Sequence, residues 1–181
     1  MLTRNRLLTA LSGLVALSLA GPAAAQAPPI KIGELNSYKV FPAFLEPYKK
    51  GWELAVEEVN AAGGVLGRKI EVVSRDDNGN PGDAVRAAEE LLSREGVAFL
   101  IGTFPSNVGL AVADFAKQRK VLFIAAEPLT DKIVWDAGNP YTFRLRTSTY
   151  MQTAMLIPDA VKLAKKRWAL VYPSYEYGQS A

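Results

Sequence analysis

The residues best suited to bind a ligand lie in one run, FLIGTFPSNVGLAVADF, at positions 99–115. Within it, Ser106 offers a hydroxyl at the predicted start of a helix, where the first backbone N–H groups lack an intrahelical partner. The helix dipole makes that end positive, so an anion such as a ligand carboxylate would be stabilised there. The local pattern is explained more simply if Ser106 only caps its helix and touches no ligand.

The sequence around Ser106 predicts a strand, a tight loop and a helix. Residues 97–101 form a short apolar run, which is typical of a buried parallel strand. Residues 102–105 contain glycine and proline and form the loop. Apolar residues then follow Ser106 at helical spacing.

The rest of the chain repeats this alternation. Apolar runs predict further strands at residues 30–35, 70–74, 121–126, 141–146 and 168–172. One helix follows a loop over residues 36–47 and runs to about residue 62, a second begins at the Asn80 cap, and another begins at Ser148 and is interrupted at Pro158. The alternation predicts a doubly wound α/β fold with a mostly parallel sheet. Ligands bind beyond the carboxyl ends of the strands in such sheets, so the candidate site comprises the loops at 36–41, 76–80, 102–106, 125–130 and 173–178.

Acidic residues follow two of the predicted strands. Glu127 comes directly after a buried strand, where a carboxylate is costly unless it is paired, hydrated or bound to a ligand. A ligand ammonium or hydroxyl is one predicted partner for it, and Arg144 is a purely structural one. Asp76 and Asp77 have no second acidic cluster to complete a shell for Mg²⁺ or Ca²⁺, so we interpret them as loop caps.

Aromatic side chains occur in the loops at the same predicted edge. Tyr38, Tyr175 and Tyr177 are suited to pack against an apolar or aromatic ligand, or to anchor their own loops. Phe41 is interpreted as an anchor.

The composition excludes several kinds of chemistry. The chain contains no Cys and no His, which excludes disulfides, Cys nucleophiles, His-based triads and the usual zinc sites within these residues. Its 21 Lys and Arg residues against 18 Asp and Glu residues form no basic cluster, so no nucleic-acid partner is indicated. No motif predicts a cofactor or a metal.

The first residues have the pattern of a secretory signal peptide. Arg4 and Arg6 precede an uncharged apolar run at residues 7–20, and three alanines at residues 23–25 supply a cleavage site before Gln26. The apolar run is shorter than an ordinary membrane span. The chain ends just after a predicted strand, so we expect it to be the N-terminal part of a longer protein.

Several motifs together resemble the periplasmic solute-binding proteins of ABC transporters, of the leucine/isoleucine/valine-binding type. The most specific is the run ELAVEEVNAAGGVLGR at residues 53–68. The resemblance extends from about residue 30 to the end of the chain. The other motifs are IKIG at 30–33, Asp76-Asp77 with Pro81, Ile101-Gly102 followed by Ser106, Phe143-Arg144 and Tyr177-Gly178.

The resemblance implies a fold of periplasmic-binding-protein type I, in which two doubly wound lobes with parallel sheets close around a ligand. After a signal peptide at residues 1–25, residues 26–147 would form the ligand-binding first lobe and residues 148–181 the start of the second. It also implies a non-enzymatic periplasmic protein, expected to be a monomer, that delivers a small carboxylate ligand to an ABC permease.

The resemblance further implies that the Ser106 hydroxyl and neighbouring N–H groups take the ligand carboxylate. The expected ligand-binding residues are Ser106, Phe104, Asn107, Ala126, Glu127, Tyr38 and Tyr177. The run AAEP at residues 125–128 is shorter than the family's usual run there. With Tyr38, Phe41 and Phe104, it makes benzoate- or cinnamate-like acids an alternative to branched-chain amino acids. A ligand-sensing ectodomain of the same fold and a secreted hydrolase or lyase are the other open classes.

Overall fold

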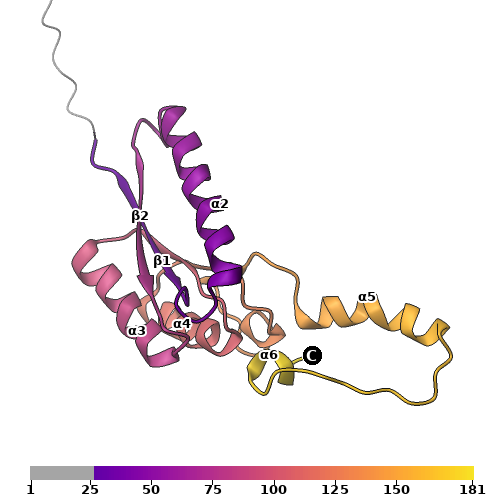
Figure 1. Ribbon diagram of the computed structural model, residues 1–181. Helices are drawn as coiled ribbons and strands as arrows, with labels where there is room; N and C mark the ends of the chain where they lie inside the picture. Colours follow the sequence, from indigo (N-terminus) through magenta and orange to yellow (C-terminus); the bar gives the residue numbers. More distant parts are fainter. Residues whose placement is uncertain (1–26) are drawn as a thin grey trace, which may run out of the picture.

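The computed structural model describes residues 27–181, so the predicted signal peptide and its cleavage site lie outside the described residues. A five-stranded sheet forms the centre of the fold, with the strands in the order β2-β1-β3-β4-β5 and every neighbouring pair parallel (Figure 1). The strands are β1 (Ile30–Asn36), β2 (Ile70–Asp76), β3 (Phe99–Gly102), β4 (Phe123–Ala125) and β5 (Thr142–Arg144). The predicted parallel α/β class is confirmed.

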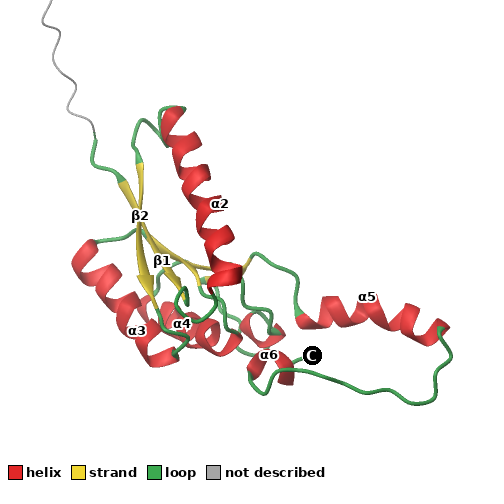
Figure 2. Ribbon diagram, in the orientation of Figure 1, coloured by secondary structure: helices red, strands yellow, loops and turns green. Residues whose placement is uncertain are grey.

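Helices connect the strands and cover both faces of the sheet (Figure 2). They are α2 (Pro42–Ala61), α3 (Pro81–Glu90), which continues as the π-helical turn η2 (Leu91–Glu95), α4 (Ser106–Arg119), the 3₁₀ turn η3 (Asp131–Ile133), α5 (Thr149–Lys162) and α6 (Glu176–Gln179). The Asn80 cap is confirmed, since its side chain accepts hydrogen bonds from the N–H groups of Gly82 and Asp83. The predicted end of α2 near residue 62 is also confirmed.

Alternation along the strands divides the sheet into two faces of different character. Leu35, Leu100 and Phe123 point to the face covered by α3 and α4, and all three are fully buried. They pack with α3 and α4 side chains such as Ala88 and Val112 in one hydrophobic cluster. This cluster fixes the position of α4, and therefore of Ser106, against the sheet.

The opposite face of the sheet is covered by α2 and is less tightly packed. Ile32, Ile101 and Ile124 on this face are only partly buried. With Trp52 and Val56 of α2 they line an apolar groove of about 210 Å³. Glu34 is the charged residue in its lining.

Three local predictions differ from the structure. The helix α2 begins at Pro42, inside the predicted loop over residues 36–47, because proline suits a first helical position and the buried Leu45 anchors the turn. The helix α5 continues through Pro158, which does not end its first segment. Residues 168–172 are not a strand, since no neighbouring strand pairs with them in the described part of the chain.

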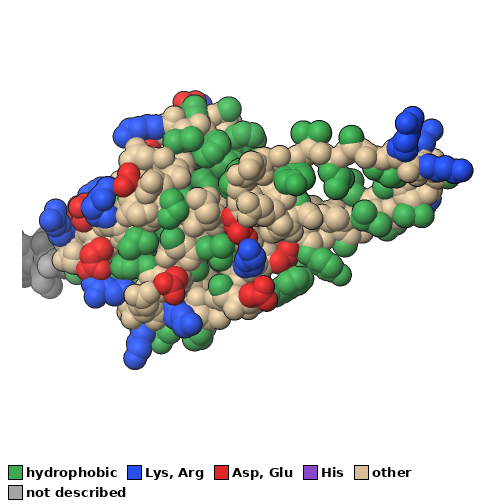
Figure 3. Space-filling view, turned by 90° about the horizontal axis from the view of Figure 1, so that it is seen from below, with side chains coloured by type: hydrophobic (Ala, Val, Ile, Leu, Met, Phe, Trp, Pro, Cys, Tyr) green, Lys and Arg blue, Asp and Glu red, His purple; other side chains and the backbone are tan. Residues whose placement is uncertain are grey.

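Residues 149–175 project from the sheet domain as an arm, made of α5 and an extended return segment (Figure 1). Its large apolar side chains are exposed, including those of Met155, Leu156, Leu170 and Val171. Figure 3 shows hydrophobic side chains along the arm. Among residues 27–181, no helix is both long enough and apolar enough to cross a membrane.

Candidate functional site

The carboxyl edge of the sheet collects buried polar side-chain atoms that make no hydrogen bond. Among the described residues these atoms are Asn36 Nδ2, Asp77 Oδ2, Thr103 Oγ1 and Asp131 Oδ1. They belong to the ends of β1 and β2 and to the segments after β3 and β4. Thr103 also has a backbone φ of +61°, which is strained for a β-branched residue. Unpaired buried groups and strain at one edge are typical of a ligand site.

Ser106 lies at this edge as the first residue of α4, and Pro105, not Ser106, is the N-cap. The expectation that Ser106 caps its helix is therefore wrong. Its Oγ instead accepts hydrogen bonds from the N–H groups of Leu129 (3.2 Å) and Thr130 (3.3 Å). Because both lone pairs of Oγ are used in this way, the hydroxyl proton is the group left to donate. Asn107 is half-buried at the next position of the same helix turn.

The loop after β4 carries two more of the predicted site residues. Ala126 is buried, and its N–H donates to Gly102 O at the end of β3 (3.1 Å). The Glu127 carboxylate forms an ion pair with Arg146. The need for a partner at Glu127 is confirmed, but the structural partner is Arg146 and the suggested Arg144 pair is wrong.

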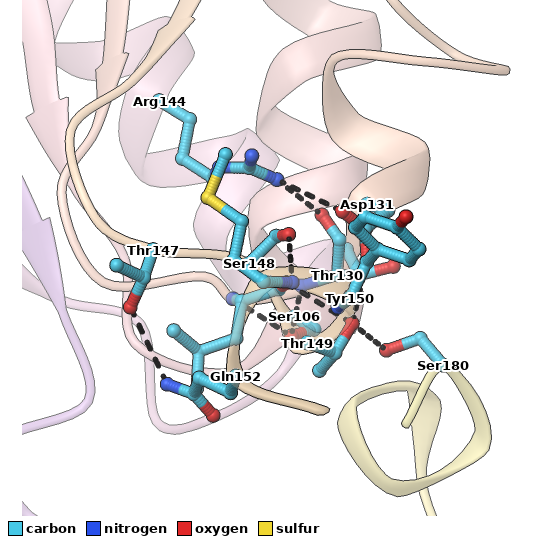
Figure 4. A network of polar contacts seen from close by, with 12 residues as sticks. Ser106, Thr130, Asp131, Arg144, Thr147, Ser148, Thr149, Tyr150, Gln152 and Ser180 are labelled. Atoms are coloured by element: carbon cyan, nitrogen blue, oxygen red, sulfur yellow. Dashed lines mark hydrogen bonds and ion pairs between the residues drawn. The ribbon is translucent and has the colours of Figure 1, made fainter. Parts of the chain in front are cut away.

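Arg144 belongs to a second polar network, which joins this loop to α5 (Figure 4). Its guanidinium donates to Thr130 O (3.3 Å) and lies 3.8 Å from Asp131 Oδ1. Asp131 Oδ2 accepts from Thr149 Oγ1 and from the Tyr150 N–H, both at 2.8 Å, at the start of α5. Burial acts to raise the pKa of Asp131, but these hydrogen bonds and the nearby arginine outweigh it and lower that pKa.

The aromatic candidates separate into two groups. Phe104 is half-buried, and its ring centroid lies 4.9 Å from Phe41 and 5.4 Å from Phe44, next to the start of α2. Phe41 thus anchors its loop, as interpreted. Tyr177 is half-buried in α6, with its ring 6.1 Å from Tyr175. The helix α6, which carries Tyr177, lies against α4, which begins at Ser106.

Tyr38 is engaged on the α2 face of the sheet. Its hydroxyl donates to Glu34 Oε1 (3.0 Å) and accepts from Trp52 Nε1 (3.2 Å), and Ser74 Oγ donates to Glu34 Oε2 (2.5 Å). Burial raises the pKa of Glu34 to about 6, although the hydrogen bonds oppose the shift. This network links α2 to β1 and β2. It engages the Tyr38 hydroxyl as both donor and acceptor.

Glu34→Gln is expected to stabilise the chain more at pH 7.5 than at pH 4.5. The folded-state pKa of about 6 exceeds the ordinary value of 4.5, so the folded state binds the proton more tightly and wild type loses stability as pH rises between these values. The difference amounts to about 2 kcal/mol, to be measured by urea unfolding at both pH values. The control is Glu53→Gln, on the half-exposed part of α2. An equal gain at both pH values would contradict the shift.

The acidic pair after β2 organises its own loop. Asp76 accepts from the N–H groups of Lys39 and Asn78, and Asp77 accepts from Ser37 Oγ and the Gly79 N–H. They are loop caps, as interpreted, although Asp77 is fully buried. Within residues 27–181 no three acidic side chains cluster as metal ligands.

Thr103, Thr130, Asp131 and Glu176 are the polar residues of this edge that sequence reasoning missed. Thr103, Thr130 and Glu176 fall within predicted site loops, and Asp131 lies just outside one. A polar residue directly after a strand, as at Thr103, is the signal that could have identified it. Asp131 and Glu176 have partners far along the chain, such as Tyr150 for Asp131 and Thr130 for Glu176. The spacing of residues along the sequence does not indicate pairs between such distant positions.

Comparison with known proteins gives matches over most of the chain. A family model described as "Periplasmic binding protein" matches residues 29–181. Leu/Ile/Val-binding protein homolog 7 of Brucella suis is 35% identical over 92% of this chain and 45% of its own length. The chain therefore spans about half the length of this curated relative.

Solved structures with different bound ligands share the fold. A solute binding protein of an ABC transporter from Rhodopseudomonas palustris BisB5, in complex with 3,4-dihydroxybenzoic acid, is 26% identical with a TM-score of 0.74, over 84% of this chain and 41% of its own. A branched-chain amino acid transporter substrate binding protein from Streptococcus pneumoniae, in complex with isoleucine, is 29% identical with a TM-score of 0.61, over 66% and 34%.

Proposed function

Because this chain belongs to the periplasmic binding protein family and has its type I α/β fold, we propose that it is the solute-binding component of an ABC importer. In this proposal it binds a small carboxylate ligand of the branched-chain amino acid type and delivers it to a membrane permease. The protein acts as a monomer in the periplasm, after removal of a signal peptide before Gln26, and catalyses no reaction.

The observation that carries the proposal is the gathering of unpaired buried polar atoms at the carboxyl edge of the sheet. Folded proteins rarely leave such atoms without a partner, and a ligand or ordered water supplies one. The Ser106 hydroxyl proton and the first N–H groups of α4 supply donors at the same edge. Donors at a helix N-terminus suit a carboxylate.

In this proposal the site lies between two lobes that close over the ligand. Residues 26–147 would form the first lobe, with Ser106, Asn107, Ala126 and Glu127, and residues 148–181 would begin the second, with Tyr177. Binding between two lobes favours the closed state of a hinged protein. The closed state would then dock on the permease.

A second ligand class is favoured by two observations. The Glu127 carboxylate is already paired with Arg146, so it is less available to a ligand ammonium. Phe104 lies in an aromatic group with Phe41 and Phe44, which suits an aromatic ring. Aromatic carboxylates without an amino group are therefore the alternative ligands.

A thermal-shift screen of the chain against aliphatic amino acids and benzoate-like acids tests the proposal. A ligand at one hundred times its Kd is expected to raise Tm by about 5 to 10 °C, because it binds the folded state only. Shifts with leucine or valine support the amino-acid ligand, and shifts only with 4-hydroxybenzoate support the aromatic one. No shift in either panel would argue against both and leave the sensing ectodomain to be tested with other ligands.

The double variant Ser106→Ala with Phe104→Ala is the matched test of the site. It is expected to weaken binding of the identified ligand at least tenfold, because it removes a hydroxyl donor and an aromatic wall. Loss of the Ser106 acceptor also costs about 1–3 kcal/mol of stability, so binding is measured by calorimetry on protein shown to be folded. Phe104→Ala alone serves if the double variant does not fold. Unchanged affinity would contradict the assignment of Ser106 and Phe104 to the ligand site.

A further inference from the structure

The short helix α6 is attached to the sheet domain by the side chain of Glu176. Its Oε1 accepts a hydrogen bond from Thr130 Oγ1 at 2.8 Å, and its Oε2 lies 3.1 Å from Lys132 Nζ. The Glu176 side chain is 14% exposed, whereas Lys132 is 51% exposed. The carboxylate is therefore mostly withdrawn from water, and its bond to the fully buried Thr130 is the better shielded of the two contacts.

Thr130 also belongs to the loop that contacts Ser106. Its N–H donates to Ser106 Oγ, while its hydroxyl donates to Glu176. One residue thus joins the start of α4 to the start of α6. A displacement of Glu176 would be passed directly to the loop at residues 129–132.

The other hydrogen bonds of α6 reach α5 or lie within α6 itself. The hydroxyl oxygens of Thr149 and Ser180 lie 3.1 Å apart, within hydrogen-bond distance. This contact connects the end of α6 to α5 and not to the loop near Ser106. Within α6, the N–H groups of Gln179 and Ser180 donate to Tyr175 O and Glu176 O. Glu176 is thus the side chain of α6 that forms hydrogen bonds to residues 129–132 in the described part of the chain.

We propose that Glu176 is a positioning residue of the ligand site. Its carboxylate fixes α6, and with it Tyr177, to the loop whose N–H groups donate to Ser106, so that the two parts of the site keep their spacing. Glu176 touches no ligand in this account. The inference deepens the proposed function and rests on it for the effect on binding.

Amide hydrogen exchange without any ligand tests the attachment. In Glu176→Ala, the amides of Gln179 and Ser180 and those of Leu129 and Thr130 are expected to exchange at least tenfold faster, with β1 unchanged as internal reference. Glu176→Gln keeps an acceptor for Thr130 and is expected to retain wild-type rates. The control Glu53→Ala removes a half-exposed glutamate that pairs with Lys49 and should change none of these amides. Unchanged exchange at residues 129–130 in Glu176→Ala would overturn the proposal.

Calorimetry with leucine and with 4-hydroxybenzoate tests the effect on the site. Glu176→Ala is expected to weaken binding of whichever probe binds wild type by at least tenfold, and Glu176→Gln to restore it to within threefold. An unchanged Kd in Glu176→Ala would overturn the positioning role. If neither probe binds wild type, the proposed function fails for these ligand classes, while the exchange rates still decide the role of Glu176.

Discussion

Gly102→Ala is expected to destabilise the chain by about 3 kcal/mol or more. Gly102 ends β3 with a φ of +120°, and a Cβ there would stand 2.2 Å from Leu35 O. That oxygen already accepts a hydrogen bond from the Thr103 N–H at 2.6 Å. The added carbon would push β1 and β3 apart where both strands meet the candidate site. Urea unfolding at pH 7 measures the loss.

Gly51→Ala is the matched control for this substitution. Gly51 lies inside the exposed part of α2, and a Cβ there would meet no atom within 4 Å. The same change is expected to stabilise the chain by about 0.5–1 kcal/mol, because alanine is the better helix former. If both variants lost similar stability, the steric explanation for Gly102 would be wrong.

Asp131→Ala is the second change with a large expected effect, a loss of about 3–5 kcal/mol. It would remove the acceptor of Thr149 Oγ1 and the Tyr150 N–H, and it would leave the Arg144 guanidinium, whose side chain is 7% exposed, without its carboxylate. The pKa of Asp131 is lowered in the folded state, so its contribution is present at neutral pH and is lost as pH falls through that pKa. The difference in unfolding free energy between wild type and variant should therefore be larger at pH 7 than at low pH.

The control is Asp159→Ala, which breaks a shorter ion pair on the surface. Asp159 lies 2.7 Å from Lys162, but both side chains are more than three-quarters exposed. The expected loss is below about 1 kcal/mol, because water screens the pair and solvates each partner alone. A loss as large as that of Asp131→Ala would show that burial is not what distinguishes the two aspartates.

Most of the fold could be predicted from the sequence, because its signals are local. Runs such as residues 97–101 and the Asn80-Pro81 helix start depend on neighbours within one turn or strand, and their elements are confirmed. The ends of elements depend on tertiary packing, as at Pro42, where the packing of Leu45 decides the start of α2. Residues 168–172 have strand composition, yet composition cannot supply the neighbouring strand that a ladder needs.

The sequence predicts the position of the candidate site better than the contacts within it. Strand ends identify the edge where Ser106, Ala126 and Glu127 lie. The partners of these residues depend on how distant loops pack, and so Ser106 contacts Leu129 and Thr130 where a helix cap was expected. Arg144 and Arg146 are two residues apart, and spacing could not decide which one pairs with Glu127.

The strand order also sets the time at which the chain can begin to fold. The strand β1 is synthesised first, but Ile30 pairs with Ile70 and Ile32 with Phe99. All ladders of the described sheet are parallel, so none can start as a local hairpin. Closing such long loops is slow. The first ladder, between β1 and β2, therefore cannot be complete until residue 76 has been synthesised, and the second must wait for residue 99.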